Sequence, residues 1–305
     1  MALVLDYHVH LWPHSERAEA LGHRLERLAD YVEVAARNGI AEIALTEHLF
    51  RFVQLSEVAG EFWRSDPDAG LRAETSGYID FHATADLDAY VEAVLQAKAA
   101  GLPVVLGLEV DYLPGRMEAI SRVLAGYPFD VLLGSVHWLG AWGFDNLDGE
   151  PSASEWERRR IETVWRAYAE AIDELAGTGA VDVLAHPDLV KLTGRRPAPA
   201  VVEECEERIA DAAGRSGLAA EISSAGLRKP VGEAYPSPSL LAKFFARAVP
   251  VTTASDSHGP ALVGTSAATL AGLARGAGYG SLRGFVGRRG RDVPIGLRGS
   301  EGAAR

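Results

Sequence analysis

The residues Leu3-Val4-Leu5-Asp6-Tyr7 form an apolar run that is typical of a buried strand, and His8-Val9-His10 follows directly. Alternate residues of a strand point to the same side, so the two imidazoles of this His-x-His pair can face one ion together. Neutral imidazole is the commonest metal ligand among side chains. The opening of the chain therefore predicts a buried strand whose carboxyl end carries metal ligands.

Short apolar runs and longer amphipathic segments alternate along most of the chain. Seven strand-then-helix units with continuously apolar strands predict a parallel sheet that is covered on both faces. We expect an α/β fold, a single distorted, closed or nearly closed (β/α)7 barrel; an open doubly wound sheet is the alternative. The apolar runs span 3–7, 40–45, 103–108, 131–133, 181–184, 218–222 and 249–254, and the helical segments about 24–38, 86–100, 115–126, 154–177, 199–216, 237–247 and 261–276.

Composition and charge exclude several classes of partner. The chain has 305 residues, is 48% hydrophobic and carries a net charge of -12, which disfavours a nucleic-acid partner because such a partner requires a basic face. No apolar run approaches the ~20 residues that cross a membrane, and no secretory leader pattern opens the chain. The single cysteine, Cys205, has no partner for an intramolecular disulfide. We expect a cytoplasmic protein that binds neither nucleic acid nor membrane; its oligomeric state stays open.

No linker rich in proline, glycine or serine divides the alternation, so we expect one barrel domain over residues 1–285. Two long segments, at about 50–85 and 138–153, are expected as insertions at the active rim of the barrel. Residues 286–305 are expected to form a partly flexible C-terminal extension that is rich in glycine and arginine, with a frayed tail at 299–305.

Polar residues with ligand chemistry stand at the carboxyl end of every predicted strand. In barrels of this type the loops after the strands converge at that end and carry the active site. Histidines and carboxylates gathered there suit a multinuclear Zn, Mn or Fe site, in which Glu109 can bridge two ions. These residues are His8 and His10 after the first strand, then His48, then Glu109 and Asp111, then His137, then His186, then Glu221 and Ser223, and last Asp256 and His258.

Each of these residues has a simpler explanation when it is taken alone. An isolated histidine after a strand is more often a loop or capping residue than a ligand, and Asp256-Ser257-His258 can cap the next helix. Glu109, however, is costly to bury without a partner. One shared metal site explains all the positions on one rim better than many separate explanations do.

The motifs that follow the strands resemble the polymerase and histidinol phosphatase (PHP) superfamily, and within it the histidinol-phosphatase branch. The resemblance extends from Asp6 to about Gly264. The combination of motifs is specific, whereas a lone His-x-His is not. The motifs are Asp6 to His10, Thr46-Glu47-His48, Gly107 to Gly115, Ser135 to Trp138, Trp142 to Asp145, Ala185 to Lys191, Ala225 to Pro230, Tyr235-Pro236 and Ser255 to His258.

The resemblance implies a barrel that binds three divalent ions (Zn, Fe or Mn). His14 departs from the family pattern because it follows the His-x-His pair after a shorter loop than usual, and this loop must still deliver it to the third ion. The second strand ends in Thr46-Glu47-His48, where much of the superfamily has Thr-Asp-His. By motif position the ligand sets are His8, His10, Glu109 and Asp256 for one ion, Glu109, His137 and His186 for the second, and His14, His48 and His258 for the third.

The same branch implies that a small phosphate ester, L-histidinol phosphate, is hydrolysed to L-histidinol and phosphate. Unaided hydrolysis of such monoesters is so slow that enzymes supply up to ~10²¹-fold acceleration. Paired divalent ions neutralise the phosphoryl oxygens and lower the pKa of bound water from about 15.7 to about 7. We expect Arg228 to hold phosphate oxygens, and Asp256 or His258 to assist proton transfer to the leaving alkoxide.

Substrate contacts are expected from residues of the same rim. The cationic end of histidinol phosphate calls for a carboxylate, for which Asp111, Glu47 or an acidic residue of 50–85 are candidates, and an aromatic ring such as Trp138 suits its imidazole. Lys229 alternates away from Arg228 and is expected to contribute less. The expected substrate-binding residues are Arg228, Lys229, Ser135, Ser223, Trp138, Asp111 and Glu47.

Three alternatives remain open at this point. A PHP-type phosphoesterase for another phosphate ester or a nucleotide keeps every metal ligand and differs in its insertions. A metal-dependent amidohydrolase also has a His-x-His pair after its first strand, but it commonly uses a carboxylated lysine at a strand end, where this chain has none. A non-catalytic metal-binding module is the third alternative, and missing ligands would favour it.

Overall fold

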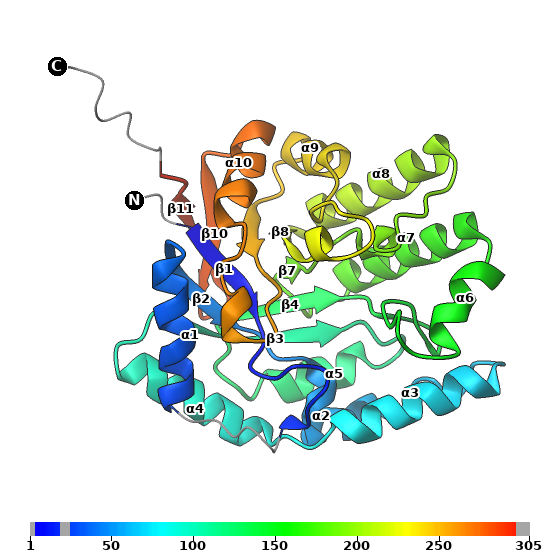
Figure 1. Ribbon diagram of the computed structural model, residues 1–305, viewed down its shortest axis with the longest axis horizontal. Helices are drawn as coiled ribbons and strands as arrows, with labels where there is room; N and C mark the ends of the chain where they lie inside the picture. The colour runs from blue at the N-terminus through cyan, green and yellow to red at the C-terminus, as the bar shows by residue number, and fades with distance from the viewer. Residues whose placement is uncertain (1–3, 19–24, 297–305) are drawn as a thin grey trace.

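The computed structural model describes residues 4–18 and 25–296, and seven strands form its main sheet (Figure 1). They lie in the order β1-β2-β3-β4-β7-β8-β9, and every neighbouring pair is parallel. Each predicted apolar run overlaps one of these strands, so the parallel α/β barrel is confirmed. The strands are β1 Val4–Val9, β2 Ile40–Leu45, β3 Val104–Asp111, β4 Val131–Ser135, β7 Val183–Leu184, β8 Ala219–Ser223 and β9 Val251–Ala254.

Hydrogen bonds between β1 and the chain at the end of β9 nearly close the barrel. His10 N donates to Ser257 O over 2.7 Å, and Ser257 N donates to His8 O over 3.3 Å. The buried carboxylate of Asp6 adds bonds from Ser255 N at 2.7 Å and Gly264 N at 2.8 Å. The first and last strands of the sheet thereby bring residues some 250 positions apart into one rim.

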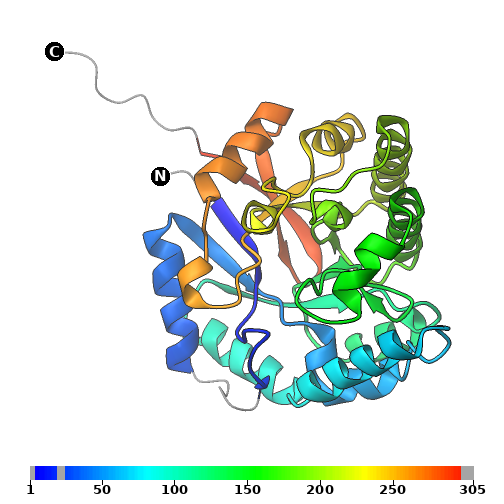
Figure 2. The ribbon, with the colours of Figure 1, turned by 45° about the vertical axis from the view of Figure 1, so that its right-hand side comes forward.

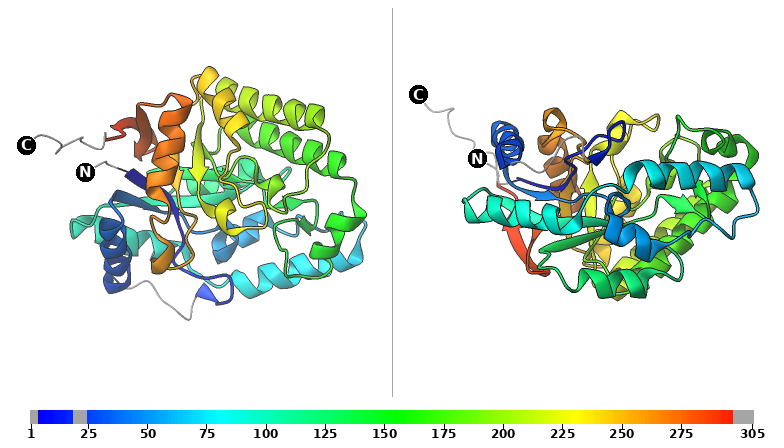
Figure 3. Two further views of the ribbon diagram at one scale, coloured as in Figure 1. Left: turned by 45° about the horizontal axis from the view of Figure 1, so that its top comes forward. Right: turned by 90° about the horizontal axis from the view of Figure 1, so that it is seen from below.

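Helices surround the strands (Figure 2). Asp86 caps α4 by accepting from Ala89 N at 2.8 Å, and Ser237 caps α9 by accepting from Leu240 N at 3.1 Å, as short polar side chains do at helix starts. No helix within 4–18 and 25–296 is long and apolar enough to cross a membrane. The barrel helices are α1 Leu25–Arg37, α4 Leu87–Ala99, α5 Met117–Leu124, α7 Ile161–Gly177, α8 Pro199–Ser216, α9 Pro238–Ala246 and α10 Ala267–Ala277, the last of which (orange) packs beside β1 (blue) in Figure 3.

Two helical segments are broken where the sequence predicts continuous helices. The segment 154–177 is two helices, α6 (Ser152–Arg158) and α7, because Arg159 is extended and Trp156 packs with Trp142 outside the barrel. The segment 261–276 begins as the 3-10 helix η5 (Pro260–Leu262), and α10 starts only after Gly264, whose φ of 68° interrupts the helix.

Both predicted insertions contain secondary structure and contact each other at the active rim (Figure 1). Thr75 Oγ1 donates to Ala141 O at 2.6 Å, and Glu74 accepts from the side chain of Asn146 at 2.9 Å. The two insertions thus form one wall beside the barrel mouth. Their elements are η2 Leu49–Arg51, α2 Val53–Ala59 and α3 Ala69–His82 in the first, and the two-residue strands β5 Trp138–Leu139 and β6 Trp142–Gly143 in the second.

The C-terminal segment is ordered further than the sequence suggests. The expected boundary at residue 285 falls inside a hairpin of β10 (Ser281–Val286) and β11 (Arg289–Pro294). Arg288 binds Asp182 at 3.0 Å at the start of β7, so the hairpin packs against the end of the barrel opposite the rim. The tail expected at 299–305 lies outside the described residues.

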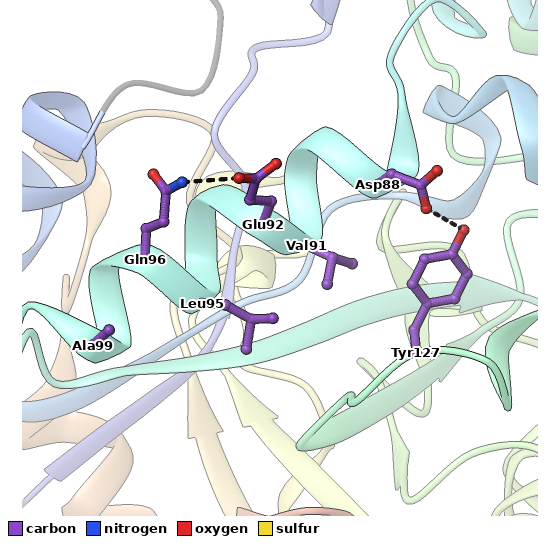
Figure 4. A pocket seen from close by; sticks show the side chains of 7 residues that line it. All are labelled: Asp88, Val91, Glu92, Leu95, Gln96, Ala99 and Tyr127. Carbon is purple, nitrogen blue, oxygen red and sulfur yellow. Dashed lines mark hydrogen bonds between the residues drawn. The ribbon is translucent and has the colours of Figure 1, made fainter.

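A shallow apolar depression lies on the exposed face of α4, where Tyr127 packs against the helix (Figure 4). Tyr127 donates to Asp88 Oδ1 at 2.7 Å, and Gln96 donates to Glu92 at 3.1 Å one turn further along. None of the residues expected at the metal site lines this depression.

A substitution at Gly134 can test how closely the strands pack against the helices. An added Cβ there would lie 2.7 Å from Val181 Cγ2 and 3.0 Å from Leu175 Cδ2. We expect Gly134→Ala to destabilise the fold by about 1–3 kcal/mol, because the surrounding core must shift. The control is Gly177→Ala in α7, where nothing lies within 4 Å and alanine favours the helix. Equal urea midpoints for the two variants would contradict the packing.

Candidate metal centre and active site

A single carboxylate, Glu109 of β3, lies at the centre of the rim and is fully buried. Five imidazoles from four different strand ends surround it. One buried carboxylate does not require so many partners to balance its charge. The pairing of the strands brings some of these residues together. β3 pairs with β4 below the rim, and His48 forms a parallel bridge with Glu109 just beyond β2. The closest distances to the Glu109 oxygens are 3.4 Å from His8, 3.7 Å from His10, 2.6 Å from His48, 3.5 Å from His137 and 3.1 Å from His186.

The second carboxylate of the cluster is Asp256. Its Oδ1 lies 3.5 Å from His10 Nε2, 3.9 Å from His8 Nε2 and 3.7 Å from His258 Nδ1. Four overlapping groups of three could each hold a metal ion within the described residues. They are His8-His10-Asp256, His8-Glu109-His186, His48-Glu109-His137 and His10-His48-His258.

His14 stands apart from the others because its side chain is exposed, yet it lies where the sequence places it. Its ring centroid is 4.2 Å from that of His258 and 5.1 Å from that of His48. Its Nδ1 is 3.0 Å from the hydroxyl of Tyr78 in α3, which fixes the ring from the other side. The shortened loop therefore brings His14 beside the third predicted group.

Backbone strain accompanies two of the expected ligands. His186 has φ 25° and Asp256 has φ 51°, values that cost a non-glycine residue of the order of 1–3 kcal/mol. Glu221 holds the first by accepting from His186 N at 3.0 Å, and Arg228 holds the second by donating to Asp256 O at 3.0 Å. Strain of this kind persists where neighbouring contacts over-determine a functional geometry.

The donor atoms of the cluster fit divalent metal ions. His8 Nε2 and both ring nitrogens of His10 are buried and make no hydrogen bond. Orphaned buried polar atoms are rare in folded proteins and call for a partner such as an ion. Imidazole nitrogen and carboxylate oxygen together form the ligand set that Zn, Mn and Fe accept.

Charges within the cluster compensate one another. Burial alone would raise the pKa of Glu109, but the imidazoles of His8, His48 and His137 lower it well below its usual range. Burial lowers the pKa of His258 to about 3, so that ring is neutral. Although burial opposes it, neighbouring carboxylates raise the pKa of His8 well above its usual range and that of His137 to about 10, so metal binding at these two rings would release their protons.

Two further carboxylates orient the histidines from behind. Glu221 Oε1 lies 2.8 Å from His8 Nδ1, and Asp111 Oδ1 lies 2.6 Å from His137 Nδ1. Such partners fix the tautomer and direction of a ligating ring. Asp111, expected as a substrate contact, is buried in this supporting position instead. Glu221 stands at a strand end in the sequence, a signal that predicts its place but not its role.

Glu47, also expected as a substrate contact, is likewise buried. Its Oε1 accepts from Trp12 N at 3.1 Å and from Leu11 N, and its Oε2 lies 3.3 Å from Arg51 Nε. Arg51 in turn donates to Trp12 O at 3.0 Å and Pro13 O at 3.3 Å. This buried pair fastens the loop that carries His14 onto the second strand end. Arg51 has no signal in the sequence beyond its position after His48.

The two serines expected at the substrate are also buried. Ser135 Oγ lies 3.4 Å from His137 Nδ1, and Ser223 Oγ accepts from Ala225 N at 3.2 Å. Both occupy the strand itself, where the hydroxyl meets local partners rather than the opening. Neither serine lines the cavity beside the histidines.

A cavity of about 500 Å³ adjoins the cluster, and His14, His48 and His137 are among the residues that line it. Trp138 lines it as expected, and so does Lys229, although the sequence suggests that this lysine points away. Arg228, expected to hold phosphate, does not itself line this cavity, and its Nη2 donates to Ser255 O at 2.8 Å. The space beside the metal ligands is therefore of ligand size.

The buried Glu47–Arg51 pair can be tested by its stability contribution. Arg51→Met leaves the Glu47 carboxylate buried without its partner, and we expect a loss of about 3–5 kcal/mol in the free energy of unfolding. The control is Arg64→Met, which removes an ion pair to Glu61 whose side chains are 82% and 62% exposed, and which should change stability by about 0–1 kcal/mol. Similar urea midpoints for the two variants would show that the Glu47–Arg51 pair does not stabilise the fold.

Residues 6–225 match the PHP domain family. A protein of Deinococcus radiodurans named "Probable histidinol-phosphatase" is 32% identical over 244 residues, 80% of this chain and 84% of that protein. A protein of Schizosaccharomyces pombe with the same name is 25% identical over 267 residues, 82% of this chain and 81% of that protein.

The fold also matches a solved structure. The crystal structure of a histidinol phosphate phosphatase from Lactococcus lactis, complexed with zinc, L-histidinol and phosphate, has a TM-score of 0.67 and 22% identity, and covers 94% of this chain and 98% of that one. At this identity the likeness establishes a shared fold. The sequence matches and the barrel rim agree: the chain belongs to the PHP domain family.

Proposed function

We propose that this protein is a histidinol-phosphatase, a metal-dependent phosphomonoesterase that hydrolyses L-histidinol phosphate to L-histidinol and phosphate. The observation that carries the proposal is its 32% identity with the Deinococcus protein over 84% of that protein's length. The buried cluster around Glu109 supports phosphatase chemistry. A phosphoryl group is strongly anionic and the chain as a whole is acidic, so divalent ions held by the cluster would supply the positive charge that the substrate requires. A small-molecule substrate also agrees with the size of the adjoining cavity.

We further propose that three divalent ions occupy the rim. Two of the three sets implied by the resemblance correspond closely to groups in the structure: His8, His10 and Asp256 lie together, and His48 lies with His258 beside His14. In the middle set Glu109 is near both His137 and His186, at 3.5 Å and 3.1 Å. When bound, the ions would neutralise phosphoryl oxygens and acidify water near neutral pH.

The chain's own residues supply positioning and charge. Arg228 Nη2 donates to Asp256 O at 3.0 Å, so the guanidinium lies beside a predicted metal ligand and can hold the oxygens of a phosphate bound there. Lys229, on the cavity wall, adds a second cation toward the same group. Asp256 and His258, 3.7 Å apart, are the groups placed to pass a proton to the leaving alkoxide.

Phosphate release is the direct test. We expect the purified protein to release phosphate from L-histidinol phosphate with a higher kcat/KM than from p-nitrophenyl phosphate, a sugar phosphate or a nucleoside monophosphate. Removal of metal with a chelator should abolish the activity, and divalent zinc, manganese or iron should restore it. A higher kcat/KM for a sugar phosphate or nucleotide would instead support the alternative phosphoesterase.

Glu109→Gln provides the matched variant for this assay. Loss of the central negative charge should lower both the metal content and kcat, the latter by at least about 10²-fold. The control is Glu118→Gln on the surface, where the side chain is 87% exposed and pairs with Arg122. Wild-type metal content and activity in Glu109→Gln would contradict the metal mechanism.

A further inference from the structure

The cavity beside the metal cluster is lined by aromatic and by acidic side chains. Neither group has a role in the hydrolysis described above. One wall carries aromatic rings from both insertions, and the other carries carboxylates from the segment after β6 (Trp142–Gly143). Because His14, His48 and His137 line the same cavity, a phosphate ester bound at the cluster can extend its alcohol part among these aromatic and acidic side chains.

The aromatic wall is built from Phe50, Tyr78 and Trp138. The ring centroid of Phe50 lies 5.4 Å from that of Tyr78 and 5.6 Å from that of Trp138, at interplanar angles of 62° and 87°. Edge-to-face contacts of this kind hold each ring in place. The three residues come from η2, α3 and β5, so the wall exists only because the two insertions meet. It offers a preformed apolar surface to a flat ring.

The carboxylates expected to meet the substrate's cation are committed elsewhere. Glu47 and Asp111 are buried behind the ligands. Glu74 lines the cavity, but its oxygens accept from Asn146 at 2.9 Å and from Ser152 Oγ at 2.8 Å, which joins the two insertions.

Asp145 is different. Its side chain lines the cavity, is only partly exposed, and forms no hydrogen bond or ion pair with the described residues. The backbone that carries it is fixed: Phe144 is fully buried, its carbonyl accepts from Trp156 Nε1 at 2.8 Å, and its N–H donates to His137 O at 3.2 Å. Although burial opposes it, the charge of Asp145 helps Glu109 to raise the pKa of His137, so the carboxylate stands near the cluster. A rigidly held carboxylate that lines a ligand-sized cavity and makes no hydrogen bond or ion pair with the described residues is prepared for a cation.

We propose that Asp145 is a specificity-determining residue: it binds the cationic amino group of the alcohol part of the substrate, while the aromatic wall packs against its ring. The site thereby selects phosphate monoesters whose alcohol carries both a cation and a flat ring, and disfavours those with an anionic alcohol part. This inference rests on the proposed phosphatase function and specifies its substrate class. Lys229, which also lines the cavity, has no ion pair among the described residues and serves the phosphate.

The physical basis of the selection is charge pairing in a partly desolvated space. A hydrogen bond between an ammonium group and a carboxylate is stronger than one between neutral groups, and it strengthens when water is excluded. Asn at position 145 keeps the shape and the hydrogen-bonding capacity but removes the charge. The effect of Asp145→Asn should therefore follow the charge of the ester and not its size.

The experiment uses four esters that separate ring from cation, assayed with the metal-loaded enzyme. L-Histidinol phosphate has both features, O-phosphoethanolamine has the cation alone, phenyl phosphate has the ring alone, and glycerol 2-phosphate has neither. We expect Asp145→Asn to lower kcat/KM by about 10- to 100-fold for the two cationic esters and by less than about 2-fold for the other two. The matched control is Asp80→Asn, an exposed carboxylate of α3 that does not line the cavity.

A second readout does not depend on turnover. Calorimetric binding of L-histidinol, the product without phosphate, should weaken by a similar factor in Asp145→Asn and stay unchanged in Asp80→Asn. An equal loss for all four esters, or no loss for the cationic pair, would overturn the role of Asp145. If the wild type prefers cationic esters other than histidinol phosphate, the proposed function fails and the selection by Asp145 stands. No preference for cationic esters in the wild type would overturn both.

Discussion

The buried carboxylate of Glu109 is the constraint on which the rest of the rim depends. An ionised carboxylate removed from water is costly unless other charges compensate it, and this one is fully buried. Five imidazoles from four different strand ends approach it within 2.6–3.7 Å. Among them His8 and His137 have a raised pKa despite their burial, and their positive charge compensates the carboxylate. The same arrangement that makes the burial tolerable also creates a set of nitrogen and oxygen donors around one point. The same imidazoles therefore stabilise the buried carboxylate and supply the donor atoms for metal binding.

The barrel supplies this arrangement through closure. Pairing at the start and end of the chain places His8 and His10 beside Asp256, and the hydrogen bonds of Asp6 hold that contact. Behind the ligands, Glu221 and Asp111 orient individual rings. The two insertions then build a cavity against the exposed side of the cluster. The strand pairing sets the positions of the ligands, the supporting carboxylates set their directions, and the insertions set the shape of the cavity.

Much of the fold and the rim could be predicted because both follow from local patterns. Continuous apolar runs indicate buried parallel strands, and a polar residue immediately after such a run must stand at the carboxyl rim. Position alone, however, does not distinguish a side chain that faces the opening from one that faces its neighbours. Asp111 and Glu47 satisfy the pattern as well as His137 does, yet they support the ligands from behind. Asp145 and Arg51 lie in insertions, where no periodicity relates sequence to direction.

We propose that Glu109 is shared between metal ions in a multinuclear site. The most direct measurement is anomalous diffraction from crystals of the metal-loaded wild-type protein, collected on both sides of the absorption edge of the bound metal. We expect two anomalous peaks, each within bonding distance of a Glu109 oxygen, and a third near His48 and His258. Peaks that are all remote from Glu109, or a rim without any peak in active protein, would contradict it.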